Sequence, residues 1–153
     1  MNWSNNQTYT HIDAIVDLLG GTDVLGSDLE GRDQLLSVSR AGLPNESLQH
    51  LLSVLDDSAG QHTATITWLR RKLSYSVDAD AKLDVISSEM TLRVATLLVA
   101  LIGVFEALEP SIDFLLAPHK SLNGLAPARA VFTSDGVEAV NKLVVQGVLG
   151  LPA

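Results

Sequence analysis

Residues 111–148 read SIDFLLAPHKSLNGLAPARAVFTSDGVEAVNKLVVQGV, and this stretch decides the fold because it is dense in signals that begin and end helices. Ser111 can cap a first short helix whose apolar residues recur at helical spacing, and Pro118 ends that helix. Pro127 suits the first turn of a second short helix, where a missing N–H costs nothing. Thr133, Ser134 and Asp135 are three candidate caps for a third helix, and Asp135 with Glu138 has the spacing of a capping box. The stretch therefore predicts a helix–loop–helix–helix module.

A series of nine residues runs through the same stretch: Leu116, Pro118, Leu122, Gly124, Pro127, Thr133, Gly136, Val140 and Leu143. Their order and spacing resemble the toxin-binding domain of the Xre/MbcA/ParS family of antitoxins. Two positions depart from the family's pattern. Phe114 and Leu115 stand near its usual Trp-Leu pair, and Ala126 precedes Pro127 where Thr is common.

Weaker resemblances to the same family extend towards the N-terminus. They are carried by LLGGTDVLG at residues 18–26, by GLP at residues 42–44 and by TITWLRR at residues 65–71. The resemblance implies an all-α fold in two parts, an Xre-like helix-turn-helix region over residues 1–77 and a small helical toxin-binding domain over residues 78–153. It also implies a homodimer that inhibits a RES-type toxin, which consumes or transfers from NAD, by covering the entrance to its active site.

The composition is that of a globular protein in a reducing compartment. Hydrophobic residues make up 46% of the 153 residues, enough for a buried core, and no cysteine is present for disulfides or thiolate chemistry. The opening MNWSNNQTYT lacks the basic and apolar regions of a signal peptide, so we expect a cytoplasmic protein. The most membrane-like run, residues 94–105, is shorter than the roughly 20 residues of a spanning helix. We therefore expect it in a core or at a subunit interface, with no membrane partner.

Apolar residues at helical spacing predict further helices in the first half of the chain. One covers residues 10–19 and stops at a Gly-Gly pair, and another runs from Pro44 or Asn45 to a polar turn. Residues 61–73 predict a third helix. The second and third helices, with the short turn between them, have the outline of a helix-turn-helix unit.

Polar and basic side chains on this unit are candidates for DNA contact. Threonines can approach phosphates or base edges, and consecutive cations neutralise phosphates. The alternative is a solvated helix end, where cations favour the negative end of the helix dipole. Because the net charge is −8, we expect any binding of operator DNA to be weak or to require a multimer. The candidates are Thr63, Thr65, Thr67, Arg70, Arg71 and Lys72.

A long helix is predicted from Ser76 or Asp78 to Leu108, with an apolar stripe that widens beyond one face. A chain of this size has a limited interior, so we expect this helix to be shared with a second copy in a homodimer. The residues expected at the dimer interface are Leu97, Leu98, Leu101, Ile102 and Phe105.

Catalytic and metal-binding patterns are not found in the sequence. The four histidines are scattered, without the HxxxH or HExxH spacing of zinc ligands. No GxGxxG or GxxxxGK loop is present to cradle phosphates, and no GxSxG elbow carries a nucleophile. We therefore expect no enzymatic activity, no metal and no cofactor.

The function expected is that of an antitoxin that binds its cognate toxin. The loop before Pro127 is one candidate for contact, and the tail VVQGVLGLPA is another because it is very apolar for a free terminus, unless it packs back on its own core. A stand-alone helix-turn-helix repressor and a structural dimerisation module are alternatives, and the resembled family commonly represses its own operon. The residues expected to contact the toxin are Pro118, His119, Lys120, Leu122, Asn123, Gly124, Val148, Leu149 and Leu151.

Overall fold

A computed structural model describes residues 11–26, 31–56, 61–74 and 80–149. Within these residues the chain is all-helical, as predicted, and its only β-type pairings are two isolated bridges. The helices are α1 (His11–Leu18), α2 (Thr22–Leu25), α3 (Arg32–Ala41), α4 (Asn45–Asp56), α5 (Thr63–Leu73), α6 (Val85–Phe105), α7 (Leu108–Leu116), the 3₁₀ helix η1 (Lys120–Leu122), α8 (Pro127–Ala130) and α9 (Ser134–Leu149).

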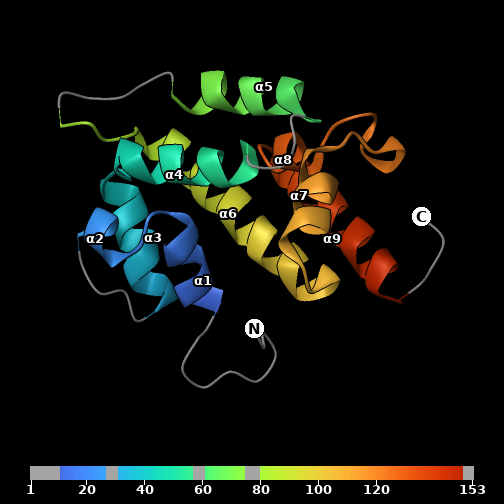
Figure 1. Ribbon diagram of the computed structural model, residues 1–153, viewed down its shortest axis with the longest axis horizontal. Helices are drawn as coiled ribbons and strands as arrows, with labels where there is room; N and C mark the ends of the chain where they lie inside the picture. Colours follow the sequence, from blue (N-terminus) through green and yellow to red (C-terminus); the bar gives the residue numbers. More distant parts are fainter. Residues whose placement is uncertain (1–10, 27–30, 57–60, 75–79, 150–153) are drawn as a thin grey trace.

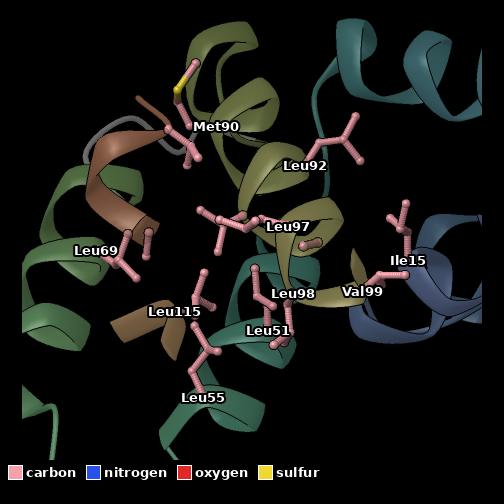
Figure 2. Packing of buried hydrophobic residues seen from close by; sticks show 14 of the residues in the cluster. Ile15, Leu51, Leu55, Leu69, Met90, Leu92, Leu97, Leu98, Val99 and Leu115 are labelled. Carbon is pink, nitrogen blue, oxygen red and sulfur yellow. The ribbon is translucent and has the colours of Figure 1, made fainter. Parts of the chain in front are cut away.

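Helix α6 runs through the middle of the molecule, with α1–α3 on one side and α7–α9 on the other (Figure 1). It packs against α1, α3, α5 and α7, so one core serves both halves of the chain. Figure 2 shows this core, in which Leu97 and Leu98 of α6 belong to the same buried cluster as Leu51 of α4 and Leu115 of α7. The packing of α6 against α1 and α3 crosses the predicted boundary between residues 77 and 78.

Helix α6 begins later than the sequence predicts. The backbone N–H of Leu83 donates to the carbonyl of Leu43 at 2.8 Å, within a short antiparallel pairing, so the residues before α6 are extended. Asp84 then caps the helix, because its carboxylate accepts a hydrogen bond from the backbone N–H of Ser87 at 2.6 Å. A contact distant in sequence thus sets the start of the central helix.

Removing the Asp84 cap is expected to weaken the fold measurably. Asp84→Ala deletes the acceptor for the Ser87 N–H, so the free energy of unfolding should fall by about 1 kcal/mol. Asp84→Asn keeps an acceptor oxygen and should unfold close to the parent chain. Urea denaturation followed by circular dichroism measures both variants. An equal loss in the two would assign the effect to the charge of Asp84 rather than to the cap.

Helix α6 is longer than the apolar run of residues 94–105 within it. The whole helix has 21 residues, and by length and composition alone it could cross a bilayer. However, 61% of its most apolar window is buried inside the fold, as in the core helix of a soluble protein. Burial by the neighbouring helices therefore accounts for its apolar character.

The module predicted at residues 111–148 is present in the predicted order, as α7, η1, α8 and α9. Pro127 occupies the first turn of α8, which confirms its expected role. The expected cap at Ser111 is wrong, because α7 begins at Leu108 and the Ser111 hydroxyl donates within the helix to the carbonyl of Ala107 at 2.7 Å. At the start of α9, the Thr133 hydroxyl accepts from the backbone N–H of Gly136 at 3.0 Å.

Candidate partner-binding site

The loop between α7 and α8, residues 117–126, is held in shape by its own backbone. Ala117 is extended, as the residue before a proline is expected to be, and this ends α7. His119 then forms an isolated bridge with Leu125, in which the His119 N–H donates to the Leu125 carbonyl at 3.1 Å. Between them, Asn123 and Gly124 both adopt positive φ and turn the chain back. The loop is therefore closed by hydrogen bonds between its own backbone groups.

Most of the predicted contact residues in this loop lie on its surface. Pro118, Lys120, Asn123 and Gly124 are exposed, as sequence reasoning required. Leu122 does not share this surface. Its side chain is 5% exposed and joins the hydrophobic core, so it anchors the loop from inside.

His119 belongs to a row of neighbouring rings, tilted relative to one another, that continues from the loop onto the helices. Its ring lies 4.5 Å from that of Phe114, and its Nε2 donates to the Phe114 carbonyl at 3.1 Å. The Phe114 ring lies 5.5 Å from that of Phe105, at the end of α6. Phe105 is 40% exposed and Leu125, opposite His119, is 39% exposed. We call Phe105, Phe114 and His119 the aromatic row.

The sequence predicts only part of the aromatic row. It predicts Phe105 at a dimer interface and His119 at a toxin contact, and it points to neither Phe114 nor Leu125 as a contact residue. The one signal for Phe114 is its place near the Trp-Leu pair of the resembled pattern. Large aromatic side chains with apolar neighbours are the usual anchors of protein interfaces, because they bury much area at little cost in conformational entropy. The loop and the aromatic row together form one candidate surface.

The C-terminal contact residues cannot be placed in the same way. Val148 and Leu149 belong to α9, but their side chains lie outside the described residues, as does Leu151. Their contact with a toxin stays a prediction.

The packing of α5 turns some of the predicted DNA-contact residues inward and leaves the others exposed. Thr65 faces inward, where its hydroxyl donates to the Leu116 carbonyl at 3.0 Å, and this hydrogen bond ties α5 to α7. Thr67 is half-buried. The remaining candidates, Thr63, Arg70, Arg71 and Lys72, are exposed. DNA contact through them stays a prediction.

Aromatic and ionic contacts also hold α5 on the C-terminal module. The Trp68 ring meets Phe132 edge to face at 4.9 Å, and the guanidinium of Arg129 lies 4.4 Å from the centre of the Trp68 ring. His62, at the start of α5, pairs with Asp113 of α7 at 3.2 Å. Helix α5 is therefore packed against α4, α6 and α8, and the hydrogen bonds of His62 and Thr65 tie it to α7.

Some of the predicted dimer residues on α6 are buried, and others are partly or fully exposed. Leu97, Leu98 and Leu101 are at most 8% exposed and pack in the core of the single chain. Contact with a second copy through them stays a prediction. Ile102 is half-buried, and Phe105 belongs to the aromatic row. The surplus of apolar residues on α6 is explained by neighbours on several sides, because α1, α3, α5 and α7 all pack against it.

Among the described residues, no group of three or more His, Asp or Glu side chains is placed to hold a metal ion. Comparisons of the chain with models of protein families, with curated proteins and with solved structures find no significant match.

Proposed function

We propose that this chain is an antitoxin that binds and inhibits a RES-type toxin through the loop of residues 117–126 and the aromatic row. The type of partner rests on the resemblance of residues 111–148 to the toxin-binding domain of the Xre/MbcA/ParS antitoxins. The observation that carries the proposal is the closed loop beside the exposed ring of Phe105. We regard repression of its own operon as a secondary role, carried by α5.

The geometry of the loop supports tight binding to a protein partner. Association is weakened by every segment that must become ordered, so a loop already closed by hydrogen bonds loses less freedom when it binds. Its exposed groups include a cation at Lys120, an amide at Asn123 and an apolar side chain at Leu125. A polar rim around apolar anchors is the usual composition of an interface.

The experiment uses a purified RES-type toxin, titrated with this chain by calorimetry. Inhibition is followed separately as the loss of NAD consumption by the toxin. Leu125→Asp places a charge at the centre of the proposed surface and should weaken binding by roughly 100-fold, as for loss of an interface hot spot. Ser53→Asp, on the exposed face of α4, is the matched control and should bind as the parent does.

Two results would contradict the proposal in different ways. A folded chain that neither binds the toxin nor reduces NAD consumption would exclude the antitoxin function with this partner. Tight binding that Leu125→Asp leaves unchanged would retain the function and move the contact surface away from the loop.

A further inference from the structure

A groove of about 710 Å³ lies apart from the loop and the aromatic row. Its floor is α6, and its walls come from α1 and α3 on one side and from residues 131–141 on the other. Figure 1 shows α1 and α9 on opposite sides of α6. Sites that bind small molecules usually measure about 300–1,000 Å³ and are lined mainly by apolar side chains. The size of this groove therefore suits a small molecule.

Apolar side chains from the floor and from both walls line the body of the groove. Ile12 and Leu36 are half-buried on the side of α1 and α3, and Val137 is half-buried on α9. Leu92 and Leu97 belong to the floor, where each is 8% exposed. Burial of apolar area is the main favourable term in binding of this kind, so the lining can hold the hydrocarbon part of a ligand.

Most of the polar groups on α6 that line the groove are already paired within the protein. The Arg93 Nη1 donates to the Val131 carbonyl at 2.9 Å, and its Nη2 lies 3.7 Å from the Glu89 carboxylate. The Thr96 hydroxyl donates to the Leu92 carbonyl at 2.7 Å. The charges of Glu89 and Arg93 therefore compensate each other, and the link from Arg93 to Val131 holds floor and wall together before a ligand arrives.

Arg32, at the start of α3, is the charged group of the lining that this pairing leaves over. Its side chain makes no hydrogen bond or ion pair with any residue that the structure describes. His11, on the same side of the groove, has an interaction of its own. The acids Asp13 and Asp33 adjoin lining residues in sequence, but neither lines the groove. The lining thus offers one uncompensated cation beside an apolar surface.

A ligand that complements this lining has an apolar chain and a single negative charge. A guanidinium can donate two parallel hydrogen bonds to a planar carboxylate. A phosphate monoester carries close to two charges at neutral pH, so one unpaired cation suits it less well. Because the chain has a net charge of −8, an anion needs such a local cation in order to bind.

We propose that the groove binds an amphipathic monocarboxylate, of which a medium-chain fatty acid is the simplest example. The hydrocarbon chain lies over α6 between the apolar walls, and the carboxylate accepts hydrogen bonds from the Arg32 guanidinium. This inference goes beyond the proposed function, because the groove shares no residue with the loop or the aromatic row. Its tests use this chain alone, without a toxin.

The first test titrates the ¹⁵N-labelled chain with sodium decanoate, below its micelle concentration, and follows the backbone amide signals by NMR. The shifts should saturate and should be largest around groove residues such as Thr96 and Val137. Decylamine has the same hydrocarbon chain and the opposite charge. It should bind roughly 10-fold more weakly, because it cannot accept hydrogen bonds from Arg32.

The second test compares variants at exposed positions, which should keep the parent's circular dichroism spectrum. Arg32→Gln removes the cation and should raise the dissociation constant for decanoate by roughly 10-fold. Arg40→Gln makes the same change on the same helix, outside the lining, and should bind as the parent does. Ala100→Phe fills part of the floor and should also weaken binding by roughly 10-fold, whereas Ser53→Phe, on α4, should not.

Several results would overturn the proposal. They are decanoate shifts that do not saturate, equal binding of decanoate and decylamine, and equal effects of Arg32→Gln and Arg40→Gln. Binding to phosphatidylglycerol vesicles without binding to free decanoate would also overturn it, and would indicate a membrane surface as the ligand instead. Each result stands whether or not the chain binds a toxin, so this proposal and the proposed function can fail separately.

Discussion

Gly136→Ala is expected to destabilise the fold strongly. Gly136 lies in the first turn of α9, and a Cβ built on it would overlap the backbone carbonyl of Ala130, at the end of α8. The obstacle is backbone rather than a flexible side chain, so α8 and α9 would have to move apart. We expect the free energy of unfolding to fall by about 3 kcal/mol or more, from a total that is typically about 5–15 kcal/mol for a domain. Urea denaturation measures the loss.

Gly147→Ala is the matched control, because it makes the same chemical change in the same helix. No atom lies within 4 Å of a Cβ built on Gly147, which is exposed in α9. Alanine favours the helix over glycine, so this variant should be unchanged or more stable by up to about 1 kcal/mol. If Gly136→Ala proved as stable as Gly147→Ala, the close approach of α8 and α9 would be refuted.

Local signals predicted the parts of the fold that depend on neighbours in sequence. The helix expected from Pro44 or Asn45 is α4, and its apolar positions Leu48, Leu51, Leu52 and Leu55 are all buried. The Gly-Gly pair does follow the end of α1, and both glycines have positive φ. Helix caps and glycine turns act over a few residues, so a sequence pattern is sufficient to find them.

Contacts between distant residues could not be predicted from such patterns. Residues 76–84 carry helix-starting signals, yet Leu83 pairs with Leu43, which is 40 positions away, and α6 starts only after it. Gly42 has a positive φ, and a Cβ there would lie 2.7 Å from the Leu83 carbonyl, so glycine permits this approach. Only the folded chain reveals why that glycine is required.

The candidate site illustrates the same limit. The sequence predicted the loop before Pro127 because Pro118 ends one helix and Pro127 begins the next. Lys120 and Asn123 are exposed in this loop, as expected. It could not show that Leu122 turns inward, because a loop residue lacks the periodicity that distinguishes buried from exposed faces. Nor could it show that the rings of Phe105 and Phe114 are neighbours, since their contact depends on the angle between α6 and α7.

Leu98→Ala is expected to destabilise the single chain rather than an assembly of two copies. The Leu98 side chain is completely buried in the cluster that includes Leu51 and Leu115 (Figure 2). Truncation would remove apolar contacts and leave a cavity that neighbouring helices fill only partly. We expect the free energy of unfolding to fall by about 2–5 kcal/mol, as for other buried leucines. Thermal or urea denaturation gives the loss.

The measurement separates a core role for Leu98 from a role between copies when it is repeated at several chain concentrations. A core residue should cause the same loss at every concentration, whereas the loss from a dimer contact should change with concentration, because association depends on it. Val104→Ala truncates a side chain that is 37% exposed on the same helix, and should cost far less stability in the monomer. A loss for Leu98→Ala that changes with chain concentration would instead support the dimer interface predicted from the sequence for this leucine.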